Sequence, residues 1–224
     1  MQITEIYASI QGESSYAGLP CVFVRLTGCN LRCGWCDSEY TFTGGRKMAA
    51  EEVLAEVRRH APIKLVEVTG GEPLLQAREL IPLMQCLLDE GYTVLLETSG
   101  ERPLADVPEG VVVIADVKCP GSGEGGTFLP ENLPQLTPED EAKFVIADRA
   151  DYEFARDFVG EHDLTSRTQV IFSPAFRKDA VGRTAENALL DPRQLSEWIL
   201  ADQLNVRLGL QLHKFIWEPQ TKGV

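Results

Sequence analysis

Three cysteines within eight residues give the strongest chemical signal in the sequence. They are Cys29, Cys33 and Cys36, spaced C-x3-C-x2-C. Thiolates are soft ligands, and clustered thiolates bind zinc or iron–sulfur clusters. A [4Fe–4S] cluster normally takes four cysteine ligands. Because this run offers three, one iron would keep an open position at which a small molecule can chelate.

A structural zinc site is the plain alternative. Structural zinc needs four closed ligands, usually as two pairs, and no second pair exists, since the other cysteines and the histidines are scattered singly. A disulfide framework is disfavoured because the chain is long and poor in cysteine. We predict that Cys86 faces the apolar side of a helix, and that Cys119 is the only lone cysteine with some chance of being reactive.

The residue before the last cysteine, Trp35, adds to this signal. With it, the cysteine run resembles that of the radical S-adenosylmethionine (SAM) superfamily. The resemblance implies that the open iron takes the amino and carboxylate groups of SAM. An electron passed through the cluster then breaks the sulfonium C–S bond and produces a 5′-deoxyadenosyl radical.

Length and charge narrow the class of protein. The 224 residues predict one domain spanning 1–224, large enough for a sizeable core. A net charge of −13 argues against nucleic-acid binding, which needs a basic surface. The first residues lack the features of a signal peptide, and no apolar run reaches the length of a membrane span. Six cysteines without a signal peptide predict a reducing cytoplasm.

Strand and helix patterns alternate along the chain. We predict strands over 22–27, 65–69, 93–97, 111–116, 142–146 and 169–172, helices over 49–59, 76–90 and 150–162, and a helix beginning at Pro192. Residues 3–8 form a mixed stretch leading into a loop over 9–14, and 206–212 is a last apolar segment. The alternation predicts an α/β fold with a parallel sheet and crossover helices. About six parallel strands are too few for a closed eight-stranded barrel, so we expect a partial, open (β/α) barrel of the radical SAM type.

Ligands of parallel α/β sheets bind at the carboxyl ends of the strands. Four unusual loops follow successive predicted strands: the cysteine loop, residues 70–73 (Gly-Gly-Glu-Pro), residues 98–100 (Thr-Ser-Gly) and residues 116–118 (Asp-Val-Lys). We expect these loops to converge on one mouth. Two glycines after a strand are by themselves often only a turn. One strand after the cysteine loop, they resemble the Gly-Gly-Glu motif of radical SAM proteins, in which Gly71 and Glu72 would hold the amino group of SAM.

A more particular resemblance is to the 7-carboxy-7-deazaguanine synthase family. It rests on residues 10–13 (Ile-Gln-Gly-Glu), Arg25, 36–38, 69–73, 116–123 and 211–214, and so covers most of the chain. It implies a carbon–nitrogen lyase of queuosine and deazapurine biosynthesis. The implied substrate is 6-carboxy-5,6,7,8-tetrahydropterin, whose ring contracts with loss of ammonia.

The resemblance also assigns roles to residues. Those that would contact SAM are Trp35, Asp37, Gly71, Glu72, Ser99, Asp116, Val117, Lys118 and Ser173. Those that would contact the substrate are Ile10, Gln11, Gly12, Glu13, Arg25, Thr69, His213 and Pro219. A magnesium ion would bind at Ser38. The family further implies a homodimer and an electron donor such as flavodoxin or ferredoxin.

The side-chain chemistry agrees with these roles. The amide of Gln11 and the carboxylate of Glu13 can form hydrogen bonds with the donors and acceptors along the edge of a pterin ring. Arg25 can form a fork on a substrate carboxylate, although an ordinary ion pair is the alternative. The Ser38 hydroxyl is a hard oxygen ligand suited to Mg²⁺, and otherwise a turn residue. His213 is equally well explained as a core histidine.

Two other functions fit part of the pattern. A glycyl-radical activating enzyme shares the cysteine spacing and a similar length, but it lacks the Gln-Gly-Glu opening at residues 11–13. A non-catalytic metal-binding module would hold zinc with sulfur and nitrogen ligands. An absorbance spectrum with iron and sulfide counts separates these alternatives.

Overall fold

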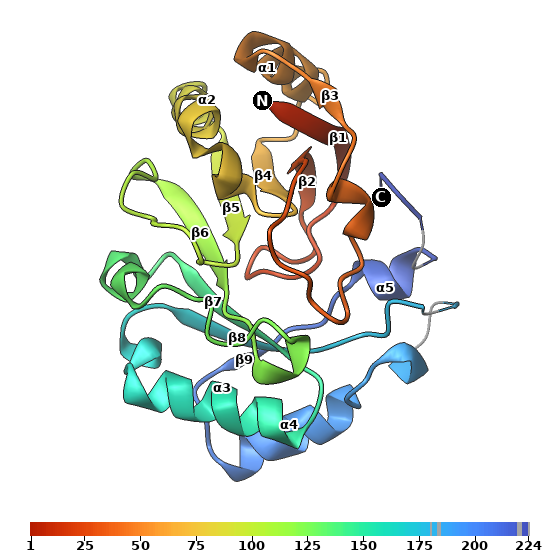
Figure 1. Ribbon diagram of the computed structural model, residues 1–224, viewed down its shortest axis with the longest axis vertical. Coiled ribbons are helices and arrows are strands. Elements are labelled where there is room, and N and C mark those ends of the chain that lie inside the picture. The colour runs from red at the N-terminus through yellow and green to blue at the C-terminus, as the bar shows by residue number, and fades with distance from the viewer. Residues whose placement is uncertain (180, 183–184, 219–220, 224) are drawn as a thin grey trace.

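The computed structural model describes residues 1–179, 181–182, 185–218 and 221–223. Within them, one curved sheet has the strand order β3-β1-β2-β4-β5-β6-β7-β8-β9 (Figure 1). The strands are β1 Gln2–Ile10, β2 Pro20–Leu26, β3 Arg46–Lys47, β4 Leu65–Gly70, β5 Thr93–Thr98, β6 Val111–Asp116, β7 Glu141–Ile146, β8 Gln169–Pro174 and β9 Arg207–Leu208. Strands β2 and β4 to β9 pair in parallel, whereas β1 runs antiparallel to β2 and β3.

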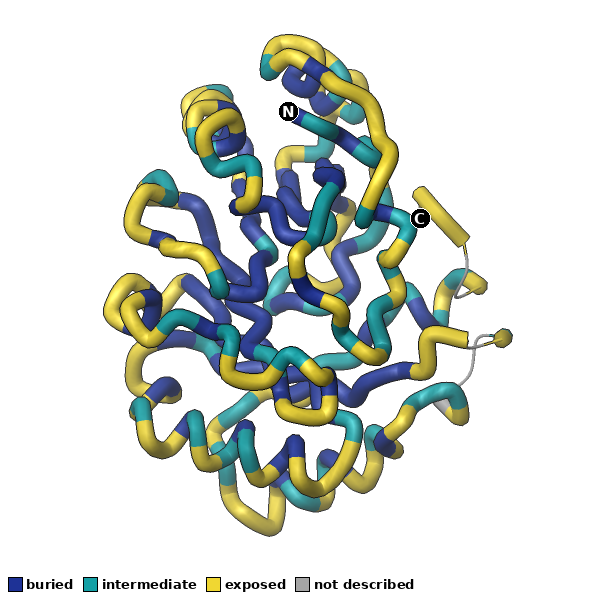
Figure 2. The backbone as a smooth tube through the Cα atoms, in the orientation of Figure 1, coloured by how far each residue is buried: buried dark blue, intermediate teal, exposed yellow. Residues whose placement is uncertain are grey.

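Helices cover the outer, convex face of this sheet (Figure 1). They are α1 Ala50–Arg58, α2 Ala77–Asp89, α3 Arg149–Glu161 and α4 Pro192–Ala201, whereas the short α5 His213–Ile216 lies apart from this layer. Each long helix buries one stripe; in α2 the buried residues are Leu80, Leu83, Met84 and Leu87, at the three- and four-residue spacing of a helix face. Figure 2 shows the exposed surfaces of these helices turned away from the buried strands. Asp148 and Asp191 cap α3 and α4 by accepting hydrogen bonds from backbone N–H groups.

The predicted partial, open barrel is confirmed. The six predicted parallel strands are present, and β9 adds a seventh of two residues. The sheet stays open because β3 and β9 lie at its two edges and are not paired with each other. Short 3-10 helices fill several connections: η1 Glu39–Thr41, η2 Pro73–Gln76, η3 Pro120–Ser122, η4 Pro130–Gln135, η5 Leu164–Ser166 and η6 Ala185–Asn187.

One expectation about the elements was wrong. Residues 2–10 form the antiparallel strand β1 rather than a mixed stretch and loop, and a register shift between Ile3 and Glu5 interrupts the alternating pattern that would have revealed it. No helix was predicted between β5 and β6 or between β6 and β7, and the described residues 99–140 contain no α-helix. These crossovers use loops and the 3-10 helices η3 and η4.

Alternation along the parallel strands gives the sheet two different faces. Side chains such as Val22, Val24, Val66 and Val68 are fully buried in the main core shared with the helices. On the inner face, the beginnings of the strands form a smaller apolar cluster of Cys21, Phe23, Leu65, Leu95, Val112 and Ile114. One or two pleats further on, the same face carries Arg25, Glu67, Thr69, Glu97, Asp116 and Lys143. The inner face is therefore apolar at one end and charged at the end where ligands bind.

Cys86 lies on the exposed side of α2, so the prediction that it faces the apolar side was wrong. It precedes the buried Leu87 by one residue, which rotates it about 100° away on a helix. Among the described residues, none of the helices combines the length and the apolar character needed to cross a membrane.

Candidate active site

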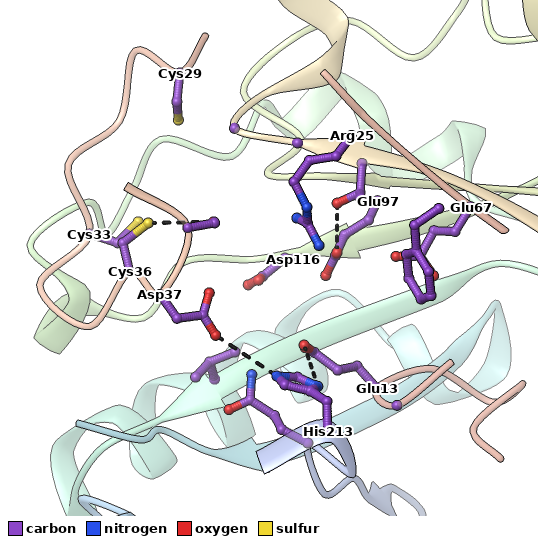
Figure 3. Close-up of a pocket in the computed structure, with 18 of the residues that line it drawn as sticks. Glu13, Arg25, Cys29, Cys33, Cys36, Asp37, Glu67, Glu97, Asp116 and His213 are labelled. Atoms are coloured by element: carbon purple, nitrogen blue, oxygen red, sulfur yellow. Dashed lines mark hydrogen bonds and ion pairs between the residues drawn. The ribbon is translucent and has the colours of Figure 1, made fainter. Parts of the chain in front are cut away.

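One cavity of about 230 Å³ lies at the carboxyl ends of the parallel strands (Figure 3). Its walls come from the cysteine loop, the ends of β4, β5 and β6, the segment after β1, and α5 near the end of the chain. The predicted convergence of the four loops on one mouth is therefore confirmed. A cavity of this size has room for a ligand much larger than water.

Most of the predicted site residues line this cavity. They are Ile10, Gln11, Gly12, Glu13, Arg25, Cys29, Cys33, Trp35, Cys36, Asp37, Ser38, Thr69, Gly71, Ser99, Asp116, Lys118 and His213. Three others, Glu72, Val117 and Ser173, are buried and do not line it. The Val117 side chain belongs to the main hydrophobic core. Pro219 lies outside the described residues.

The glycine turn after β4 is locked against the cysteine loop. A Cβ atom added at Gly71 would lie 2.3 Å from the Gly28 carbonyl oxygen and 2.6 Å from the Cys29 Cβ, so only glycine fits there. The Glu72 N–H also donates to the Gly28 carbonyl at 2.8 Å. The glycine is thus required by close packing of two loops, which is a more specific reason than turn formation alone.

The three motif cysteines are half-buried around one end of the cavity. In Figure 3, Cys29 lies on one limb of its loop, apart from Cys33 and Cys36. Among the described residues, no three His, Cys, Asp or Glu side chains converge on a single metal position. Each thiolate of a [4Fe–4S] cluster binds its own iron, so such a cluster does not require that convergence, whereas a zinc site does. Burial raises the pKa of the Cys33 thiol to about 11, so a bound cluster would displace its proton.

The carboxylate of Glu72 is fully engaged by the protein. It accepts hydrogen bonds from the Leu74 N–H at 3.0 Å, the Thr98 hydroxyl at 2.8 Å, and both the N–H and the hydroxyl of Ser99 at 2.9 and 2.7 Å. Because these bonds tie the turn after β4 to the turn after β5, Glu72 fixes the position of Ser99 at the cavity wall.

An unsatisfied acceptor marks the wall beside the cysteines. Asp116 Oδ2 pairs with the Lys118 ammonium at 2.9 Å, while Asp116 Oδ1 is buried without a hydrogen-bond partner. An orphaned buried acceptor costs stability unless a donor satisfies it. SAM carries hydroxyl and amino donors, so this wall fits such a ligand.

On the opposite wall, two predicted substrate residues already have protein partners. The Gln11 amide donates to Glu67 Oε2 at 2.9 Å and accepts from the Glu13 and Ser14 N–H groups. Arg25 donates to Glu5 Oε1 at 3.1 Å and to the Tyr7 hydroxyl at 2.9 Å. Gln11 therefore shapes the loop that presents Glu13, and Glu5 and Tyr7 orient the Arg25 guanidinium.

Three charged cavity residues that lie on strands were not predicted: Glu67, Glu97 and Lys143. Each interrupts an otherwise apolar parallel strand, and this interruption is the signal that could have found them. Burial, together with the nearby Glu97 carboxylate, raises the pKa of Glu67 to about 8. The floor of the cavity thus holds a carboxyl group that is protonated at neutral pH beside ionised ones.

The mouth of the cavity is closed by contacts from α5. The Lys214 ammonium forms an ion pair with Asp37. His213 lies between two carboxylates, with its Nε2 3.9 Å from Asp37 Oδ2 and its Nδ1 3.8 Å from Glu13 Oε1 (Figure 3). The alternative of a core histidine is thereby disfavoured. The Ser38 hydroxyl is 3.7 Å from the Cys36 sulfur.

Cys119 lies away from this cavity, with its side chain buried in the main core. Burial strongly raises the pKa of its thiol, with Asp151 and Asp116 contributing to the same effect. A buried, protonated thiol is unreactive, so the structure does not support the reactivity that the sequence suggested.

The chain is similar to known proteins over its whole length. The radical SAM superfamily profile matches residues 23–118. The 7-carboxy-7-deazaguanine synthase of Koribacter versatilis is 69% identical over 226 residues, covering 100% of both chains. The enzyme of the same name from Chlorobaculum tepidum is 42% identical and covers 100% of this chain and 97% of its own.

Solved structures show the same fold. QueE from Escherichia coli has a TM-score of 0.73 at 23% identity, over 94% of this chain and 93% of that one. Streptococcus suis SuiB bound to S-adenosylmethionine has a TM-score of 0.57 at 12% identity, over 84% of this chain and 46% of its own. These structures show the fold alone, whereas the full-length sequence identity to the two synthases assigns the chain to a family. By this similarity the chain belongs to the 7-carboxy-7-deazaguanine synthase family of radical SAM enzymes.

Proposed function

We propose that this enzyme converts 6-carboxy-5,6,7,8-tetrahydropterin to 7-carboxy-7-deazaguanine with loss of ammonia. The observation that carries the proposal is a single cavity with the three-cysteine loop at one end and the oriented Arg25 fork and Glu13 at the other. A reaction that starts at a cluster-bound cofactor and acts on a small anionic substrate needs both ends in one enclosed space.

The chain's own residues divide the work within this cavity. Cys29, Cys33 and Cys36 would hold a [4Fe–4S] cluster, which, when loaded with SAM, supplies a one-electron cleavage of the sulfonium bond. Asp116 and the Gly71 turn border the space for SAM. Further along, the Arg25 guanidinium would bind the substrate carboxylate, because Glu5 and Tyr7 use only part of its donor set. Glu13 would accept from the pterin ring.

Other features of the proposal rest on family membership and chemistry. Mg²⁺ would bind at the Ser38 hydroxyl, which faces the cavity. A low-potential donor such as flavodoxin or ferredoxin would supply the electron. We place the enzyme in the cytoplasm, since an open-site iron–sulfur cluster needs a reducing compartment, and we expect a homodimer.

Substrate discrimination tests this function. Buried polar groups matched to one ligand reject analogues that lack the partner group, by on the order of 10⁴-fold. A tetrahydropterin without its 6-carboxylate should therefore turn over poorly. Arg25→Ala should lower kcat/KM for the carboxylated substrate by roughly 10- to 100-fold, and far less for the analogue, because the lost charge pair no longer distinguishes them.

The measurement compares wild type and Arg25→Ala with both pterins, assayed anaerobically for product mass after cluster reconstitution. Arg59→Ala is the matched control, since Arg59 is exposed at the end of α1 and forms an ion pair with Glu56. If reduced, cluster-loaded wild type gives no deazaguanine from the carboxylated pterin, the substrate assignment is wrong. A glycyl-radical activase would then become the leading alternative.

A further inference from the structure

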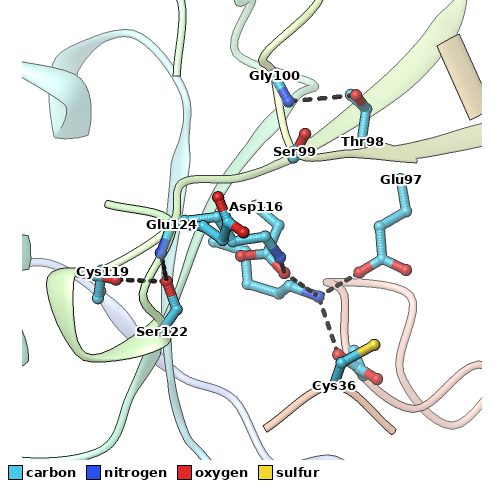
Figure 4. A network of polar contacts seen from close by, with 12 residues as sticks. Cys36, Glu97, Thr98, Ser99, Gly100, Asp116, Cys119, Ser122 and Glu124 are labelled. Atoms are coloured by element: carbon cyan, nitrogen blue, oxygen red, sulfur yellow. Dashed lines mark hydrogen bonds and ion pairs between the residues drawn. The ribbon is translucent and has the colours of Figure 1, made fainter. Parts of the chain in front are cut away.

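Lys143 is the most thoroughly buried charge in the cavity, with a side chain only 1% exposed. It extends from the middle of β7 onto the inner face of the sheet. Its ammonium contacts Glu97 on β5, Glu13 Oε2 at 2.9 Å in the segment after β1, and Asp116 Oδ2 at 3.6 Å at the end of β6. Figure 4 shows Glu97 and Asp116 turned toward the same part of the cavity. One cation therefore serves three carboxylates from three separate elements.

Glu13 and Glu97 depend on Lys143 more than Asp116 does. Lys118 pairs with Asp116, and His213 lies 3.8 Å from Glu13. Glu67 on β4 is protonated at neutral pH, Glu141 on β7 itself is bound to Ser15, and Asp37 is paired with Lys214. Among the described residues, no second lysine or arginine forms an ion pair with Glu13 or Glu97.

The ionisation of Glu13 depends on this contact. Burial raises the pKa of Glu13, yet the charges of Lys143 and His213 outweigh burial and leave that pKa below its ordinary value. Burial likewise opposes the charge of Lys143, and Glu13, Glu97 and Asp116 together reverse the effect, so its pKa lies well above normal. Glu13 and Lys143 therefore hold each other in their charged forms.

We propose that Lys143 is a positioning residue that holds Glu13, Glu97 and Asp116 together at one cavity and keeps Glu13 ionised. It thereby joins the substrate wall, which carries Glu13, to the cofactor wall, which carries Asp116. Lys143 itself touches neither ligand in this role. The inference rests on the proposed function for the identity of the substrate, but its electrostatic content is independent of turnover.

The consequence is a defined pH dependence. In the wild type, the pKa of Glu13 lies below its ordinary value of 4.5, so Glu13 should stay ionised and should not weaken pterin binding between about pH 5 and pH 8. In Lys143→Met, burial remains while the neighbouring positive charge is lost, so the pKa of Glu13 should rise. An opposite charge within 4–6 Å shifts a carboxylate pKa by about 1–3 units. The pH below which pterin binding weakens, here called the acid limb, should therefore rise by at least about one pH unit.

Titration calorimetry of 6-carboxy-5,6,7,8-tetrahydropterin onto anaerobic, cluster-loaded protein between about pH 5 and pH 8 tests this. We expect Lys143→Met to bind the pterin at least tenfold more weakly near pH 5 than wild type does, because its acid limb lies at a higher pH. Lys143→Arg keeps the charge and should keep the wild-type limb. Lys64→Met is the matched control, because Lys64 is exposed, contacts the Tyr92 ring, and does not line the cavity.

If Lys143→Met does not fold, the double variant Lys143→Met, Glu97→Gln removes one buried negative charge and should still show the shifted limb. An unshifted limb in either folded variant, or the same shift in Lys143→Arg, overturns the proposal. Failure of the proposed function can be told apart from failure of the Lys143 proposal, because wild type itself would then bind no pterin. In that case the affinity for SAM alone, which we expect Lys143→Met to lower through Asp116, decides the role of Lys143.

Discussion

Lys214 forms an ion pair with Asp37, the residue that directly follows the last cysteine of the motif. The two residues are 177 positions apart in the chain. Lys214 is 6% exposed, and the helix that carries it, α5, is in turn docked on the loop after β1, where the Leu212 N–H donates to the Gly12 carbonyl at 3.0 Å. The end of the chain therefore holds the exit of the cysteine loop.

Lys214→Met should loosen the cysteine loop. The pair is buried on the lysine side and partly exposed on the aspartate side, so its loss should lower the free energy of unfolding by on the order of 1 kcal/mol. Iron should also be released faster to a chelator. Lys47→Met, which alters an exposed lysine on β3, is the control. Equal rates of iron release in the two variants would contradict the role of Lys214.

The same pair should respond to pH. Burial raises the pKa of Asp37, but His213 and Lys214 outweigh burial and hold that pKa well below its ordinary value. The contribution to stability is therefore present at neutral pH and is lost as the pH falls through the lowered pKa of Asp37. Denaturant titrations at several acid pH values should show this slope in the wild type and a smaller one in Lys214→Met.

The cluster ligands are tested by alanine substitution. Changing Cys29, Cys33 or Cys36 singly to alanine should abolish cluster binding and SAM cleavage, because each thiolate binds its own iron. Cys86→Ala should leave both intact, since Cys86 is exposed on α2 and does not line the cavity. Iron and sulfide analysis with an absorbance spectrum measures the outcome. A triple-alanine variant that still bound four irons would refute the ligand assignment.

Ser38→Ala tests the magnesium proposal. A hydroxyl that contributes one ligand to Mg²⁺ should, when removed, weaken the dependence of turnover on added Mg²⁺ while SAM still binds. Turnover is followed across a magnesium titration, with Ser166→Ala, which alters the exposed 3-10 helix η5, as the control. Unchanged activity and metal response would leave Ser38 as only a turn residue.

Glu67→Gln should change how stability varies with pH. The pKa of Glu67 rises from its ordinary 4.5 to about 8, so the folded chain binds a proton that the unfolded chain releases between these values. The Glu67 contribution thus lowers stability as the pH rises from about 4.5 to 8. Glu67→Gln should remove this change in the free energy of unfolding, which is on the order of 1–3 kcal/mol between the two pH values. The amide oxygen of the new glutamine can still accept a hydrogen bond from Gln11.

Unfolding titrations between these pH values measure the difference between wild type and Glu67→Gln. Glu109→Gln is the control, because Glu109 is exposed in the loop before β6. If Glu67→Gln keeps the full wild-type slope, Glu67 is ionised in the folded protein and the description of the cavity floor is wrong.

The sequence by itself determined the chemistry at one end of the cavity and the order of the elements. The cysteine spacing and the Gly-Gly-Glu turn are local patterns, legible because their residues are neighbours along the chain. Apolar runs of strand and helix length are equally local, and so the six parallel strands and the open barrel could be predicted. The strand β1 could not, because its register shift breaks the local alternation.

Only the tertiary structure decided which polar side chains meet. Glu13, Glu97, Asp116 and Lys143 come from four segments, and a charge inside a strand does not reveal its partners. Likewise, nothing near Asp37 in the sequence indicates Lys214. Glu72 is assigned to a ligand by its motif, yet its carboxylate is saturated by residues 74, 98 and 99. Electrostatic partners in a buried cavity depend on distances through space, and these exist only once the sheet has curved and closed its loops over one mouth.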